Sequence, residues 1–221
     1  MALTKYNYNS FNVTPVASKA LAFNSGANGL TTAAEGYMVL IKTLTADGSG
    51  TSLSFVDGSS DVVLDNTYPT YLFKFINIHN QTSAKYLSFQ VSTDTGSSYG
   101  VQITSTHFRA YHYENGTSAT IEYSGGDDLA NGTGIQHIGQ DIGVNNDDST
   151  SGELWLFNPS STTFIKNFLV RTSNCVSTPT AQDAFTSGYV NTASAVDAVQ
   201  FSISSGNMDS GTISLYGIKD S

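Results

Sequence analysis

Residues 151–173, SGELWLFNPSSTTFIKNFLVRTS, decide the fold class. The runs ELWLF and FIKNFLV are apolar at nearly every position, which is typical of strands that are covered on both faces. Between them, Pro159 presets φ for the first central position of a turn, and Asn158 can hydrogen-bond the backbone two residues on. We therefore predict a central β-hairpin of a packed two-sheet protein, with Phe164 on a buried face.

The alternating pattern of apolar and polar residues recurs along the chain from residue 37 onward. The strongest single strand is YLFKFINIH, and the Asn115-Gly116 dipeptide between two runs is a specific β-hairpin signal. A turn at DGSG predicts a second hairpin that joins the first two strands. Strands are expected at residues 37–45, 52–56, 71–79, 86–93, 99–104, 106–114, 118–123, 198–204 and 212–218, with a short apolar run at 61–65.

Two stretches show no strand pattern. Residues 125–151 form the longer one, and a long loop in a compact domain usually carries function or a partner contact. We expect a short helix near residues 127–131 and one helical turn at 181–185, within an irregular stretch at 179–191. With about ten short strands and almost no helix, the sequence predicts an all-β, jelly-roll-like antiparallel β-sandwich.

The first 35 residues differ from the rest. Their apolar residues are scattered, with one short strand expected at 19–23, yet Tyr6, Tyr8, Phe11 and Phe23 are many aromatics for a solvated tail. We predict two parts: an extended N-terminal arm at residues 1–35, used for anchoring or contact between subunits, and a β-sandwich domain at residues 36–221. A poorly ordered terminus is the alternative interpretation of the arm.

Composition excludes several classes of function. The net charge of −9 argues against binding to nucleic acid, which needs clustered Lys and Arg, and against docking on anionic membranes. Cys175 is the only cysteine, so no internal disulfide can form. No apolar run approaches the ~18 residues of a membrane-spanning helix, so we expect no membrane insertion. The N-terminal residues MALTKYNYNSF lack an apolar signal region, and we expect synthesis in a cytoplasm without general secretion.

No catalytic motif is apparent, and we expect no enzyme activity, no cofactor and no metal site. His107 and His112 lie five apart on one expected strand, so they should point to opposite faces. The acidic run at 145–149, NNDDS, could supply oxygen ligands for calcium, but it lacks the spacing of a calcium loop, and a solvated turn is the alternative. Trp155, Tyr111 and Tyr113 could form a carbohydrate platform, with core packing as the alternative.

Three longer phrases resemble a known family: IKTLTADGSGTSLSFVDGSSDVVLDNTYPTYLFKFINIH, SGELWLFNPSSTTFIKNF and VQFSISSGNMDSGTISLYGIK. They are similar to small β-sandwich virion proteins of marine tailed bacteriophages of the cyanophage and pelagiphage type. The resemblance covers most of residues 37–219, and SFNVTPVASKALAFNSGANG resembles the leading segment of those proteins.

The resemblance implies a structural protein exposed on the virion and assembled in the host bacterial cytoplasm, such as a capsid decoration (cement) protein. Its implied partners are copies of itself, with a trimer expected by analogy, and other virion proteins of the capsid or tail. The alternative is a tail-fibre or receptor-binding protein that contacts host surface glycans through residues 125–151 and exposed aromatics. A glycan depolymerase is a third hypothesis, and the family brings no catalytic motif that could be transferred.

Overall fold

The computed structural model describes residues 21–23, 26, 30–32 and 36–220. The chain divides into two compact units, Met1–Tyr37 and Met38–Ser221. In the first unit, β1 (Leu21–Phe23) pairs antiparallel with β2 (Leu30–Thr32). The aromatic residues Tyr6, Tyr8 and Phe11, which suggested an anchoring arm, lie outside the described residues.

The second unit is built from strands alone. Its described residues contain no helix, so the short helical segments expected at 127–131 and 181–185 are wrong. The all-β prediction is confirmed. The strands are β3 (Met38–Thr45), β4 (Ser52–Val56), β5 (Thr70–Asn80), β6 (Lys85–Ser92), β7 (Ile103–Tyr113), β8 (Ala119–Tyr123), β9 (Gln136–Ile142), β10 (Thr150–Phe157), β11 (Lys166–Val176), β12 (Thr180–Val190), β13 (Ala198–Ile203) and β14 (Met208–Ile218).

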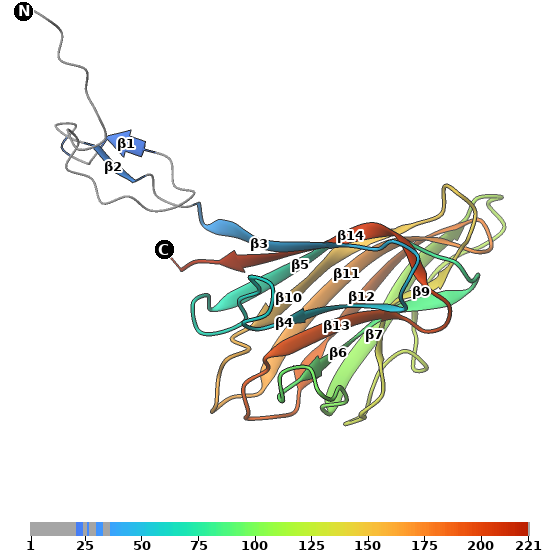
Figure 1. Cartoon of the computed structure of the whole chain (residues 1–221). Helices are drawn as coiled ribbons and strands as arrows, with labels where there is room; N and C mark the ends of the chain where they lie inside the picture. The colour runs from blue at the N-terminus through green and yellow to red at the C-terminus, as the bar shows by residue number, and fades with distance from the viewer. Residues whose placement is uncertain (1–20, 24–25, 27–29, 33–35, 221) are drawn as a thin grey trace, which may run out of the picture. The chain divides into compact units, whose positions relative to one another are not determined.

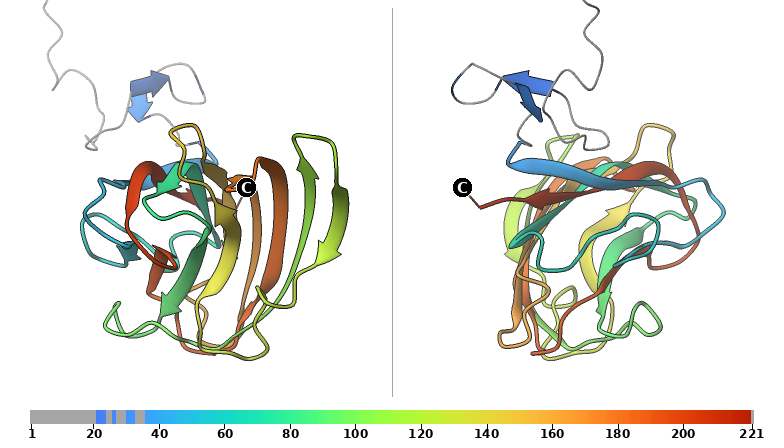
Figure 2. Two further views of the ribbon diagram at one scale, coloured as in Figure 1. Left: turned by 90° about the vertical axis from the view of Figure 1, so that its right-hand side faces the viewer. Right: turned by 60° about the vertical axis from the view of Figure 1, so that its left-hand side comes forward.

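These strands form two antiparallel layers (Figure 1). The large sheet has the order β3-β14-β5-β10-β11-β12-β7-β8, and the small sheet has the order β4-β13-β6-β9. A single residue pair, Val176 with Ile142, links β11 to β9 and so joins the two sheets. In the left view of Figure 2, the green β7–β8 hairpin lies at the outer edge of the large sheet.

The connections between strands have jelly-roll winding. Setting aside the β11–β12 hairpin and the outer β3–β14 pair leaves the orders β4-β13-β6-β9 and β5-β10-β7-β8. From β4 to β7, each strand lies in the other sheet from the strand before it. The same alternation holds along the succession β8, β9, β10 and β13. This alternation is the winding of a jelly roll, in which two Greek keys form a double-sheet sandwich.

Phenylalanine rings fill the space between the sheets. Phe201 of β13 lies 5.1 Å from both Phe73 and Phe75 of β5, measured between ring centroids, and all three side chains are fully buried. Phe89 of β6 meets Phe168 of β11 edge to face at 5.0 Å. Such edge-to-face pairs add to the stabilisation from burial, and here they bind one layer to the other.

The predicted central hairpin forms, although its second strand begins only at Lys166 and only one of its faces is buried. β10 pairs with β11, and Asn158 in the turn has a φ of 47°, a value that asparagine tolerates. Leu169 is 51% exposed and Phe164 is 68% exposed, so the prediction that both faces are covered, with Phe164 buried, is wrong. The small sheet covers the inner face alone, which leaves outward apolar residues accessible.

Several expected elements differ from the structure. β3 and β4 do not form a hairpin, because β3 pairs with β14 in the large sheet and β4 pairs with β13 in the small one. The expected strand at 99–104 begins only at Ile103, as the start of β7. The run at 61–65 is not a strand, although Val62 and Leu64 are buried. β9 and β12 lie in the two stretches that showed no strand pattern.

Candidate functional site

The outward face of the large sheet is hollowed into a groove of about 630 Å³, named the sheet groove below. It spans five neighbouring strands, β5, β10, β11, β12 and β7, which amounts to about 19 Å at the usual strand spacing. The side chains that define the groove are Lys74, Ile76, Ala110, His112, Ser151, Glu153, Arg171, Ser173, Ala181 and Asp183, together with Gly152.

Strand register explains why these residues meet. Glu153 stands opposite Lys74 on one side and opposite Arg171 on the other. Ser173 pairs with Asp183, which in turn pairs with Ala110. Directly opposed residues of antiparallel strands share a face of the sheet, so side chains far apart in sequence form rows across the groove.

The floor of the groove is low because the outward residues at its centre are serines and alanines. Gly152 lies at a register shift between β10 and β5. A Cβ atom at this position would collide with the Arg171 carbonyl oxygen and would lie 2.8 Å from Cα of Thr172. Only glycine therefore fits the close approach of β10 and β11 at this point of the groove floor.

A second, more apolar hollow of about 340 Å³ continues from the sheet groove and shares Glu153 and Arg171 with it. We call it the aromatic trough. The ring of Phe108 stacks on Phe185 with centroids 4.9 Å apart and planes 7° from parallel. The remaining wall consists of Trp155, Leu169, Thr186, Ser187 and Val170.

Arg171 forms the boundary between the two hollows. Its Nε and Nη2 donate hydrogen bonds to the two carboxylate oxygens of Asp183 at 3.0 and 2.7 Å. Its guanidinium also lies over the Phe185 ring, 5.0 Å from the centroid. The hydrogen bonds and charge of Asp183 raise the pKa of Arg171 above its ordinary value. A forked guanidinium held on an aromatic ring is a fixed group that presents donors in a defined plane.

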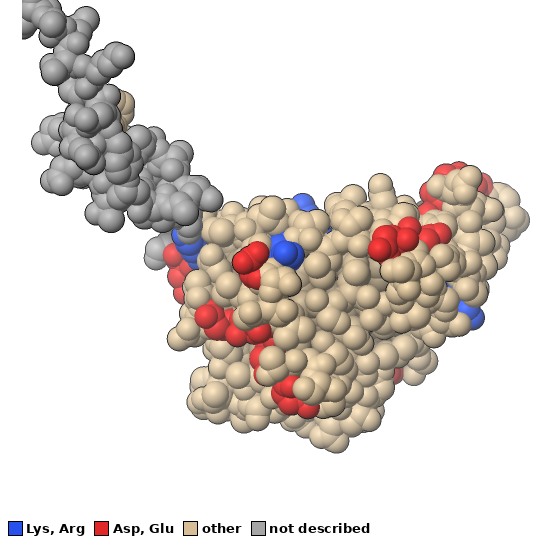
Figure 3. Space-filling model, in the orientation of Figure 1, with Lys and Arg blue, Asp and Glu red and all other residues tan. Residues whose placement is uncertain are grey.

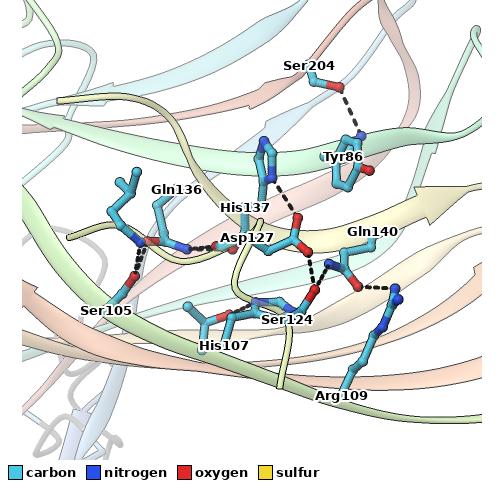
Figure 4. A network of polar contacts seen from close by, with 12 residues as sticks. Tyr86, Ser105, His107, Arg109, Ser124, Asp127, Gln136, His137, Gln140 and Ser204 are labelled. Carbon is cyan, nitrogen blue, oxygen red and sulfur yellow. Dashed lines mark hydrogen bonds and ion pairs between the residues drawn. The ribbon is translucent and has the colours of Figure 1, made fainter. Parts of the chain in front are cut away.

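The interior behind β7 contains a polar network, shown in Figure 4. The carboxylate of Asp127 binds the Nδ1 of His137 at 2.9 Å and accepts a hydrogen bond from Ser124 at 2.5 Å. Gln140 donates to Ser124 and accepts from Arg109. Burial alone would raise the pKa of Asp127, but the hydrogen bonds from His137 and Ser124 lower it on balance.

This network anchors the chain between β8 and β9. The side-chain amide of Gln136 donates to the backbone oxygen of Asp127 at 2.7 Å, and Ser105 donates to Gln136 at 2.6 Å. Among the hydrogen bonds of the described residues, none joins Ser124 to His137, the contact that a nucleophilic serine would require. The hydrogen bonds that are present hold the segment between β8 and β9 against β7 and β9.

The acidic run at 145–149 lines a polar hollow with His79 and Asp209. Asp148 is buried, and its carboxylate already accepts hydrogen bonds from the backbone and side chain of Asn145 and from the Cys175 thiol. Within the described part of the chain, no three His, Cys, Asp or Glu side chains are grouped so that they could hold a metal ion.

Cys175 is half-buried beside Asp148. Burial, together with the hydrogen bond to this carboxylate, raises the pKa of the Cys175 thiol to about 11. The thiol is therefore protonated at neutral pH, which does not suit a nucleophile.

The structure separates the residues that the sequence singled out. Trp155 lies in the aromatic trough, whereas the Tyr111 ring packs near Arg109 and Tyr113 on the opposite face of the sheet. His107 is fully buried and His112 is exposed. Residues 125–151 are not one long loop, because β9 occupies their centre. Sequence reasoning missed the groove itself, since it arises from register between distant strands.

The fold and the groove define an antiparallel β-sandwich with jelly-roll winding and an exposed hollow on its large sheet. Comparison with protein-family models, curated proteins and solved structures gives no match. No helix in residues 36–220 or in the described parts before them has the length and apolar character needed to cross a membrane.

Proposed function

We propose that the chain is a structural protein of a bacteriophage, exposed on the virion as a capsid decoration protein or another particle-stabilising component. The resemblance of its long sequence phrases to virion proteins supports this proposal. So does its surface, which has few charged side chains: on the face in Figure 3, acidic groups lie at separate places among a largely uncharged surface. The particle would be assembled in the host cytoplasm.

One observation carries the proposal that the protein assembles with copies of itself. β8 is the outermost strand of the large sheet, and among the described strands it pairs only with β7. It presents two large apolar side chains, Ile121 at 75% and Tyr123 at 59% exposure. Exposed apolar edge strands pair with other chains unless they are protected. We therefore assign β8 to the contact between subunits of a homo-oligomer, with a trimer as the expected form.

Replacing Ile121 with lysine is expected to dissociate the oligomer while the sandwich stays folded, because a charge would have to be buried at the contact. Light scattering after size-exclusion chromatography measures the mass, and circular dichroism checks the fold. Thr120→Lys is the matched control, since Thr120 is also exposed on β8 but points to the other face. A wild-type protein that is monomeric, or an Ile121→Lys variant that keeps the oligomer, would contradict the role of β8.

Copy number tests the virion role directly. Quantitative mass spectrometry of purified particles, referenced to the major capsid protein, is expected to give a copy number of the same order as that protein. A few copies per particle would instead favour the second candidate, a tail-fibre or receptor-binding protein. Absence of the chain from purified particles would refute both.

A further inference from the structure

We infer that the sheet groove and the aromatic trough together bind a neutral oligosaccharide. The inference goes beyond a structural role on the particle and does not depend on it, because it rests on the chemistry of one face of the isolated sandwich. Trp155, Glu153 and Arg171 are its central residues.

The charges of the groove cancel. Lys74 and Arg171 are basic, and Glu153 and Asp183 are acidic, so the four formal charges that line the groove sum to zero. Along the register they alternate in sign, from Lys74 to Glu153 to Arg171. A groove of this kind has no preference for an anionic or a cationic polymer, and the net charge of −9 on the whole chain disfavours a polyanion. The complementary ligand is uncharged.

The groups in the groove match a ligand rich in hydroxyls. A sugar hydroxyl both donates and accepts hydrogen bonds. The Arg171–Asp183 pair offers donors and acceptors side by side, held at 2.7 Å, and Ser151 and Ser173 place two further hydroxyls on the floor. Hydrogen bonds to charged groups are about twice as strong as those between neutral groups. A bound hydroxyl can therefore bridge the guanidinium and the carboxylate.

The apolar part of the surface matches the C–H faces of sugar rings. Trp155 and the stacked rings of Phe108 and Phe185 lie along the trough. Phe108 is 43% exposed and Leu169 is 51% exposed, so this surface is accessible. Pyranose rings carry C–H groups on one face, and the negative face of an aromatic ring attracts such groups. The two hollows have volumes of about 630 and 340 Å³, within the range of ligand sites.

The chain offers a direct probe, because Trp155 is its only tryptophan. The full-length protein would be titrated with gluco-, manno- and galacto-oligosaccharides, and with alginate oligomers as the acidic counterpart. Tryptophan emission and quenching by acrylamide would be recorded. We expect at least one neutral oligosaccharide to change the emission saturably and to protect Trp155 from the quencher, and alginate to do neither.

Variants separate binding from folding. Trp155→Ala and Arg171→Met are each expected to weaken binding by calorimetry at least about ten-fold, whereas Phe164→Ala, which removes an exposed aromatic outside both hollows, should bind as the wild type does. If Trp155→Ala does not fold, Arg171→Met alone decides, with circular dichroism as the check on its fold.

Three results would overturn the inference. The first is that no neutral saccharide in the panel perturbs Trp155. The second is saccharide binding that both variants retain. The third is protection of Trp155 that grows with protein concentration alone, which would identify a second copy of the chain as the occupant.

Discussion

Replacing Phe201 with alanine is expected to lower the free energy of unfolding by about 3–5 kcal/mol, the usual cost of truncating a buried phenylalanine. Phe201 is fully buried, and its ring contacts Phe73 and Phe75 of the opposite sheet and Phe55 and Phe89 of its own. Its removal leaves a cavity between the two sheets that several rigid rings cannot close. Urea unfolding followed by circular dichroism measures the change, with an unaltered denaturant slope expected.

Phe164→Ala is the matched control. The same atoms are removed, but from a side chain that is 68% exposed in the turn between β10 and β11, so a change within about 0.5 kcal/mol is expected. Equal losses in the two variants would mean that the phenylalanine layer does not join the sheets. A large loss in Phe164→Ala alone would restore the sequence-based prediction that Phe164 is buried.

The sequence predicted strands well where inward residues are apolar. In β5, the residues YLFKF place Tyr71, Phe73 and Phe75 on the inner face, and Leu72 is buried as well. The strand lies between β14 and β10, as expected for a central strand. The Asn115-Gly116 hairpin also forms, because Gly116 adopts a φ of 71° that the turn requires. The existence of the strand and of the hairpin turn follows from local sequence in both cases.

β12 and β9 were missed because their inward residues are polar. In β12 the buried positions include Thr180, Gln182 and Thr186, so no apolar alternation marks the strand. β9 buries Gln136 and Gln140, which the network around Asp127 satisfies with hydrogen bonds. A sequence pattern reports hydrophobicity, whereas these side chains are buried through partners on distant strands that no local pattern reveals.

The pairing of the strands and the position of the groove could not be predicted from local sequence either, because both depend on residues of distant strands. The DGSG turn after β3 does reverse the chain, but β4 enters the other sheet, since jelly-roll winding separates consecutive strands. Of the groove and trough side chains, only Trp155 and His112 were singled out from the sequence, and neither was connected with the others. The groove could have been recognised by placing the outward residues of β10, β11 and β12 side by side. This requires the pairing register of the three strands.

Replacing Asp127 with alanine is expected to cost about 2–3 kcal/mol at neutral pH, because it leaves buried polar groups without partners. The Asp127 carboxylate, which is 9% exposed, binds both His137 and Ser124. His137 in turn stacks on Tyr86 of β6, with centroids 4.4 Å apart. Loss of the carboxylate therefore loosens the segment that closes this end of the sandwich.

Asp128→Ala is the control for this prediction, and the pH dependence of the free energy of unfolding is its specific test. Asp128 contacts the exposed Tyr123 hydroxyl, so Asp128→Ala should change stability by no more than about 0.5 kcal/mol. The pKa of Asp127 in the folded state is lowered from 3.8. The contribution of its carboxylate to the free energy of unfolding is therefore complete above this pH, and it is lost as the pH falls through the lower folded-state pKa. Asp127→Ala should thus differ from the wild type most above pH 5 and least in strong acid. An equal deficit at every pH would show that the carboxylate contributes through packing alone, and its hydrogen bonds with His137 and Ser124 would then carry no stability.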